Sequence, residues 1–115
     1  MDFPAPTEAD IQRVVDLVVH TVQPLRIVLF GSAARGELGK GSDLDMMVVM
    51  PEGTDSLRTA QTLHVAMGRQ RDLVVRVGVD FVVTTPERYE ARKDSLGSVF
   101  REVARDGREL YDSAA

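Results

Sequence analysis

Two aspartates with one residue between them are the part of this sequence best suited to chemistry. Asp43 and Asp45 begin an apolar run that continues to Met50 and predicts a β-strand. On a strand, residues two apart face the same side and lie about 6.6–6.8 Å apart along the backbone. Two carboxylates at that spacing repel each other unless a cation or water screens them. The pair fits a hard cation such as Mg²⁺, and a solvated strand end is the alternative interpretation.

A glycine–serine turn precedes the aspartates and could bind phosphate. Gly31 directly follows the apolar run RIVLF (26–30), and a glycine there lets the backbone approach a ligand closely. If a short helix begins near Ser32, its free N–H groups form an anion site. The side chains of Ser32, Arg35 and Ser42 could each donate to phosphate oxygens. An ordinary turn is the alternative for this segment, and a routine turn serine is the alternative for Ser42.

Asp80 supplies a third carboxylate in a strongly β-forming part of the chain. It interrupts an apolar run, residues 73–84, that predicts the longest strand. Burying an unpaired charge is costly, so an acid in this run needs a partner or solvent. One interpretation places Asp80 on a strand beside the first two aspartates, where three carboxylates converge on two metal ions. The other makes it a solvent-facing position, which Arg76 and Gly78 on the same face would support.

The elements that position these residues follow from hydrophobic periodicity and from capping signals. Strands are predicted at 26–30, 43–50 and 73–84, with a brief edge strand at 109–111. Helices are predicted from Thr7 to Pro24, after a cap at Thr54 or Asp55, from Pro86, and at 95–105 up to Gly107. The helix after Thr54 or Asp55 is expected to face the core through Leu57, Ala60, Leu63 or His64, and Met67. This order predicts an α+β (α/β) fold, with a small mixed sheet of three to four strands flanked by helices.

Composition indicates one compact globular domain. The chain has 115 residues, of which 43% are hydrophobic and 28% charged, and we expect a single domain over 1–115 with a core at 7–85 and a C-terminal helical part at 86–112. A net charge of −4 argues against extended nucleic-acid binding, and the absence of cysteine excludes disulfides and thiolate metal sites. The sequence shows no signal peptide and no apolar run near the ~20 residues of a membrane span. We therefore expect a cytoplasmic protein without a membrane segment.

Together, the glycine–serine turn, the D-x-D pair and the later aspartate resemble a known superfamily. The pattern GSAARG (31–36), SDLD (42–45) and Asp80 within a β run is similar to the nucleotidyltransferases with the DNA polymerase beta-like fold. The short length and the helix-first order resemble the minimal nucleotidyltransferase (MNT) domains, the MntA-type antitoxins of HEPN/MNT toxin–antitoxin pairs. The resemblance covers residues 7–85 most fully and the C-terminal helices more loosely.

The resemblance implies a role for each residue of the pattern. Gly31 and Ser32 would hold the β- and γ-phosphates of a nucleoside triphosphate such as ATP. Asp43 and Asp45 would bind two divalent ions, Mg²⁺ or alternatively Mn²⁺. Asp80 would bind the ion that activates the attacking hydroxyl. Because a metal lowers the pKa of that hydroxyl, no histidine base is needed, which leaves the two histidines of the chain without a catalytic role.

The resemblance also implies an acceptor on another protein. A chain of 115 residues has no room for the acceptor-binding domains of larger nucleotidyltransferases. An MNT antitoxin would transfer NMP, AMP from ATP, to a hydroxyl of its HEPN-domain toxin. Two alternatives stay open: a partner-binding antitoxin with little or no catalysis, and a nucleotidyltransferase acting on a small molecule such as an antibiotic. An oligomer is compatible with all three, and the base preference is not encoded in the motifs.

Overall fold

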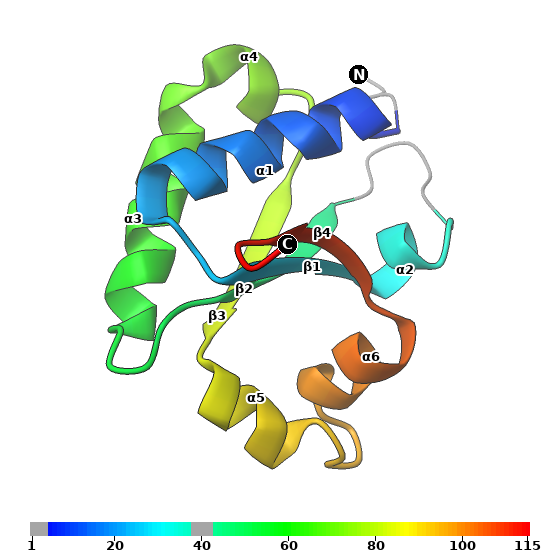
Figure 1. Ribbon diagram of the computed structural model, residues 1–115. Coiled ribbons are helices and arrows are strands. Elements are labelled where there is room, and N and C mark those ends of the chain that lie inside the picture. The colour runs from blue at the N-terminus through cyan, green and yellow to red at the C-terminus, as the bar shows by residue number, and fades with distance from the viewer. Residues whose placement is uncertain (1–4, 38–42) are drawn as a thin grey trace.

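The computed structural model describes residues 5–37 and 43–115, so the predicted phosphate ligand Ser42 lies outside the described residues. A four-stranded mixed sheet with the strand order β3-β2-β1-β4 forms the centre. Helices cover both faces of this sheet, which gives three layers (Figure 1). The expected fold, a small mixed sheet flanked by helices, is confirmed.

The central pair of strands places the predicted site at one end of the sheet. β1 (Arg26–Phe30) pairs antiparallel with β2 (Leu44–Val49) on one side and with β4 (Arg108–Asp112) on the other. β2 also pairs with β3 (Val79–Thr84) in parallel. A parallel pair needs a crossover connection, and helices between β2 and β3 provide it. The end of β1 and the beginnings of β2 and β3 consequently lie at the same end of the sheet.

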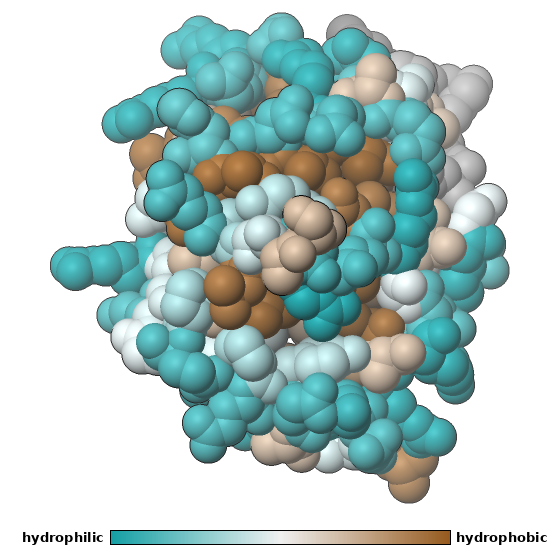
Figure 2. Space-filling view, viewed as in Figure 1, coloured by the Kyte–Doolittle hydropathy of each residue, from teal (hydrophilic) through white to brown (hydrophobic). Residues whose placement is uncertain are grey.

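The first helix begins and packs as its sequence predicts. α1 (Glu8–Val22) starts with a capping box, in which Thr7 and Asp10 each accept a hydrogen bond from the other's backbone N–H. Its apolar stripe is buried against the sheet and consists of Ile11, Val14, Val15 and Val18. In the space-filling view, hydrophilic side chains make up most of the visible rim, while an apolar band lies between α1 and β4 (Figure 2).

The second helix of this layer, α3 (Ser56–Arg69), is capped by Asp55, as predicted, but its buried face differs in part. Leu63 and Met67 are buried as expected, whereas Leu57 is 71% exposed and Thr59 takes the inward position. Thr59 can be buried there because its hydroxyl donates to the Asp55 carbonyl oxygen over 2.9 Å. The prediction for Leu57 is therefore wrong by half a turn.

Alternate residues of the central strands supply both cores, as the period of two requires. The α1 and α3 face receives Ile27 and Leu29 from β1 and Met46 and Val48 from β2. The opposite face buries Val28, Phe30, Met47 and Val49 beneath α5 (Pro86–Arg92) and α6 (Val99–Asp106). Pro86 opens α5 as predicted. α6 begins at Val99 rather than Ser95, because the hydroxyl of Ser98 caps it.

The predicted strand over 73–84 is wrong in its first half. A short helix, α4 (Arg71–Val74), and a turn occupy this part, and β3 begins at Val79. Backbone N–H groups here bond locally, as in Val77 to the Leu73 carbonyl oxygen over 3.0 Å. Leu73 and Val77 are buried while Val75 between them is 58% exposed, which is a helical spacing and not an alternating one.

Two further elements complete the described chain. α2 (Gly31–Ala34) is the short helix expected after the first strand, and β4 is the predicted edge strand, extended by a residue at each end. Within residues 5–37 and 43–115, no helix has both the length and the apolar character needed to cross a membrane.

Candidate active site

The strand register brings the predicted carboxylates together. Asp45 on β2 lies directly opposite Asp80 on the parallel strand β3, and opposite Phe30 at the end of β1. Residues opposite each other in a parallel pair point to the same face of the sheet. Asp43 immediately precedes β2. All three acids therefore gather at one end of the sheet, on the side covered by α5 and α6.

The electrostatic environment of Asp45 reflects this gathering. The pKa of the Asp45 carboxyl is raised, first by burial and then by the negative charges of Asp80, Asp43 and Glu102. Like charges this close disfavour ionisation, because each added charge repels the others. The arrangement is a concentration of negative charge that a cation would relieve.

Gly31 is required by its place beside Asp45. Its φ of +70° lies in the left-handed region that favours glycine, and it is buried at the start of α2. A β-carbon added here would lie 2.5 Å from the Asp45 Oδ2 atom. Ser32 follows in α2 and is half-buried. Gly31 therefore packs closely against the Asp45 carboxylate, while the assignment of Gly31 and Ser32 to phosphate binding stays a prediction.

Arg35 lies at the same end of the sheet and is held by carboxylates. Its guanidinium forms ion pairs with Glu37 over 3.2 Å and with Glu102 on α6 over 3.1 Å. Both hydrogen bonds raise the pKa of Arg35, that to Glu102 most. Its assignment as a phosphate ligand stays a prediction, and a bound phosphate would compete with these two partners.

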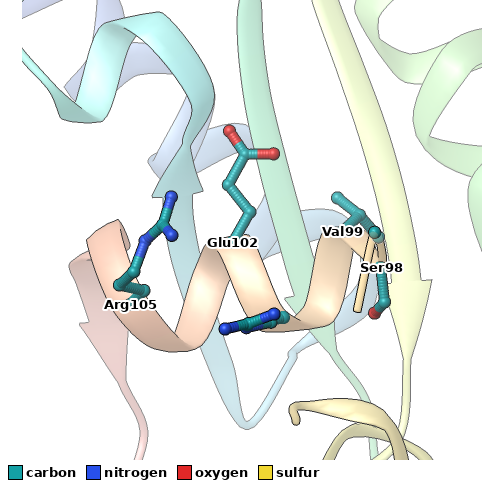
Figure 3. A pocket seen from close by; sticks show the side chains of 6 residues that line it. Ser98, Val99, Glu102 and Arg105 are labelled. Atoms are coloured by element: carbon teal, nitrogen blue, oxygen red, sulfur yellow. The ribbon is translucent and has the colours of Figure 1, made fainter. Parts of the chain in front are cut away.

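Glu102 is a neighbour of the site that the sequence reading missed. It follows Asp45 by 57 positions and belongs to no motif, so only the packing of α6 against the sheet brings it near. Figure 3 shows its side chain rising from α6 toward α2 and the strands. A pocket of about 360 Å³ lies along this side of α6 and is lined by Gly97, Ser98, Val99, Arg101, Glu102 and Arg105 (Figure 3).

The donor set suits a divalent ion of the hard class. Carboxylate oxygens are the ligands that Mg²⁺ and Mn²⁺ take, and like charges on adjacent strands favour binding a cation. In the described part of the chain, no three acidic or histidine side chains are close enough to hold a single ion as they stand. Cation binding would therefore draw the three aspartates closer to one another. The two histidines lie outside the site: His20 on α1 is exposed, and His64 on α3 is exposed and forms a T-shaped ring pair with Phe81.

A family model decides the class of protein to which this site belongs. The model for the nucleotidyltransferase domain matches residues 11–109, which is most of the chain. The chain belongs to the nucleotidyltransferase domain family. The matched range includes the glycine–serine turn, all three aspartates and α6. No curated protein sequence matches the chain significantly.

Solved structures show the same nucleotidyltransferase fold. One is a predicted nucleotidyltransferase from Sulfolobus solfataricus, with a TM-score of 0.61, 17% identity, and coverage of 92% of this chain and 80% of that chain. Another is a mutant of the toxin–antitoxin MntA–HpeT, with a TM-score of 0.60, 17% identity, and coverage of 89% and 73%. A third is a toxin–antitoxin with AMP-PNP, with a TM-score of 0.54, 22% identity, and coverage of 89% and 73%. At these identities the likeness concerns the fold.

Proposed function

We propose that this nucleotidyltransferase domain transfers AMP from ATP to a hydroxyl group of a partner toxin, and thereby acts as an antitoxin. The observation that carries the proposal is the register of β2 and β3, which sets Asp45 opposite Asp80 with Asp43 beside them. Three carboxylates next to a glycine–serine turn suit a metal-bound triphosphate. The family match over residues 11–109 supports the reaction class.

The chain's own residues would bind and orient the substrate. The glycine–serine turn lets the backbone approach the β- and γ-phosphates, and the Ser32 hydroxyl would donate to one of their oxygens. Asp43, Asp45 and Asp80 would hold the divalent ions. When bound, those ions supply charge neutralisation at the phosphates and a lowered pKa for the attacking hydroxyl. Arg35 would exchange a carboxylate partner for a phosphate oxygen.

The reaction balances as a displacement at the α-phosphorus. The acceptor oxygen forms the new P–O bond while the bond to the bridging oxygen of pyrophosphate breaks. The hydroxyl proton leaves to solvent, and pyrophosphate departs. No histidine base takes part, which agrees with the position of His20 and His64 outside the site.

The identity of the acceptor rests on the structural neighbours. Two of them are toxin–antitoxin structures, one of an MntA–HpeT mutant and one with AMP-PNP. A shared fold at 17–22% identity supports a partner toxin and an adenine nucleotide as the donor. That the toxin is of the HEPN class is what the resemblance of the motif to MNT antitoxins implies. Adenylylation would add charge and bulk to the toxin and so disable it. We place the protein with its partner in the cytoplasm.

Transfer of label tests the proposal. The protein is incubated with α-labelled ATP, Mg²⁺ and the protein encoded by the neighbouring gene, as the candidate toxin. It is compared with Asp43→Asn, Asp45→Asn and the control Asp16→Asn on the exposed side of α1. Wild type and the control should label the toxin and release pyrophosphate. Either site substitution should reduce both at least about 100-fold, since even indirect partners of metal ligands cost 10–100-fold.

Two other results would each replace the proposal with an alternative. Neutralisation of the toxin without label transfer, equal in wild type and both site variants, would leave a binding module. Pyrophosphate release that needs a small-molecule hydroxyl, such as an aminoglycoside, and not the toxin would leave a small-molecule nucleotidyltransferase.

A further inference from the structure

Gly78 lies directly beneath the Asp43 side chain. A β-carbon built on Gly78 would overlap the Asp43 Oδ1 atom and lie 3.0 Å from its carboxyl carbon. The backbone of Gly78 is not in the left-handed region, so its conformation alone would accept alanine. What excludes a side chain at this position is therefore the Asp43 carboxylate.

The backbone at Gly78 is held from both sides and cannot easily move away. Its carbonyl oxygen accepts a hydrogen bond from the Leu44 N–H over 2.8 Å, at the start of the β2 and β3 pairing. The preceding residue, Val77, is 1% exposed in the main core. One residue earlier, Arg76 forms an ion pair of 3.0 Å with the buried Asp10 on α1. An added methyl group would consequently be accommodated by movement of Asp43.

Asp43 can make that movement at little energetic cost. It is exposed, and its carboxylate is the end of a flexible side chain that can rotate into solvent. We propose that Gly78 is a positioning residue of the nucleotidyl-transfer site: its missing side chain leaves the space in which the Asp43 carboxylate stands beside Asp45. This inference rests on the proposed function in treating Asp43 as a ligand of the divalent ion.

The test uses Gly78→Ala with Gly68→Ala as the matched control. Gly68 lies in α3, and an added β-carbon there would meet nothing within 4 Å. The first readout is the crystal structure of metal-free Gly78→Ala, in which the Asp43 side chain should adopt a different rotamer. The second is thermal melting against Mg²⁺ concentration without nucleotide. Gly78→Ala should need a Mg²⁺ concentration at least roughly tenfold higher than wild type to reach the same increase in melting temperature. Gly68→Ala should respond to Mg²⁺ as wild type does.

Several results would overturn the inference. An Asp43 carboxylate in its wild-type position in the Gly78→Ala crystal would do so, as would an unchanged Mg²⁺ response. If Gly78→Ala fails to fold, the double variant Gly78→Ala/Asp43→Ala decides: recovery of folding supports the clash with Asp43, and failure of both contradicts it. A wild type without any Mg²⁺ response would count against the proposed function, and the crystal readout would still test the role of Gly78.

Discussion

At the scale of single residues, Asp45 combines the influences that define the site. It is half-buried, lies opposite Asp80 and beside Gly31, and its pKa is raised by burial and by neighbouring carboxylates. A group of this kind destabilises the protein when charged and stabilises it when a cation is bound. The ligand-free stability of the fold should therefore report on the site.

The variant Asp45→Asn should be at least as stable as wild type when metal is absent. With the folded pKa above the ordinary 3.8, the folded protein keeps its proton at pH values where the unfolded chain has lost it. The free energy of unfolding of wild type therefore falls as the pH rises from below 3.8 through the raised pKa of the folded state. The Asp45→Asn variant lacks this group and does not lose that stability. In EDTA, the melting temperature of the variant relative to wild type should increase between about pH 3 and about pH 7.

The addition of Mg²⁺ should reverse this order. The free energy of unfolding of wild type should increase by about 2.7 kcal/mol when the ion is at 100 times its dissociation constant. The increase for Asp45→Asn should be much smaller. Asp16→Asn serves as the control, since Asp16 lies on the exposed side of α1 and accepts a hydrogen bond from Gln12. An Asp45→Asn variant that melts clearly below wild type in EDTA at about pH 7 would show that the carboxylates do not repel one another as inferred.

At the scale of elements, the start of α1 connects two parts of the fold. Asp10 closes the capping box with Thr7, and the same carboxylate pairs with Arg76 in the turn before β3. The Asp10 side chain is only 4% exposed, so its negative charge would be costly to bury without the ion pair to Arg76. The helix cap thus also fixes the segment that leads to Gly78 and Asp80.

Replacement of Asp10 by alanine should lower the free energy of unfolding by about 1–3 kcal/mol. Loss of an N-terminal capping interaction costs about 1 kcal/mol, and the loss of the partner of Arg76 adds to it. Urea unfolding measures the change. Glu8→Ala is the control, because its ion pair with Arg108 lies on the surface and should contribute little to stability. Equal effects of the two substitutions would contradict the role given to Asp10.

Most of the elements were predictable because their signals are local. The capping residues of α1 and α3, the apolar run of β1 and the proline of α5 each act within a few residues. The conformation of the segment 73–78 was not predictable, since a run of valines permits both strand and helix. Only the exposure of Val75 in the folded chain distinguishes the two. Leu57 likewise depended on tertiary packing.

The site divides in the same way. The glycine–serine turn and the three aspartates could be proposed as a site from the sequence, because their types and spacing form a motif. Glu102 and the role of Gly78 were not, because each depends on an element that the fold brings in from elsewhere in the sequence. The sequence pattern puts Gly78 on the same strand face as Asp80, whereas in the structure the neighbour of Gly78 is the Asp43 side chain.

At the scale of the whole molecule, the sheet separates a structural layer from a functional one. α1 and α3 cover the face with the larger core, and α5 and α6 cover the other face (Figure 1). The carboxylates face the side of α5 and α6. On that side Glu102 adds a fourth negative charge, and Arg35 joins it to the glycine–serine turn. A nucleotide at the strand ends would therefore lie near Glu102 and the pocket on α6 that Glu102 lines.

A crystal structure with Mg²⁺ and a non-hydrolysable ATP analogue tests this arrangement most directly. We expect two ions ligated by Asp43, Asp45 and Asp80, with the three carboxylates closer together than in the ligand-free chain, and the terminal phosphates against Gly31 and Ser32. Ions or phosphates bound elsewhere, or an Asp80 carboxylate that touches neither ion, would contradict the assignment of this edge of the sheet as the site of nucleotidyl transfer.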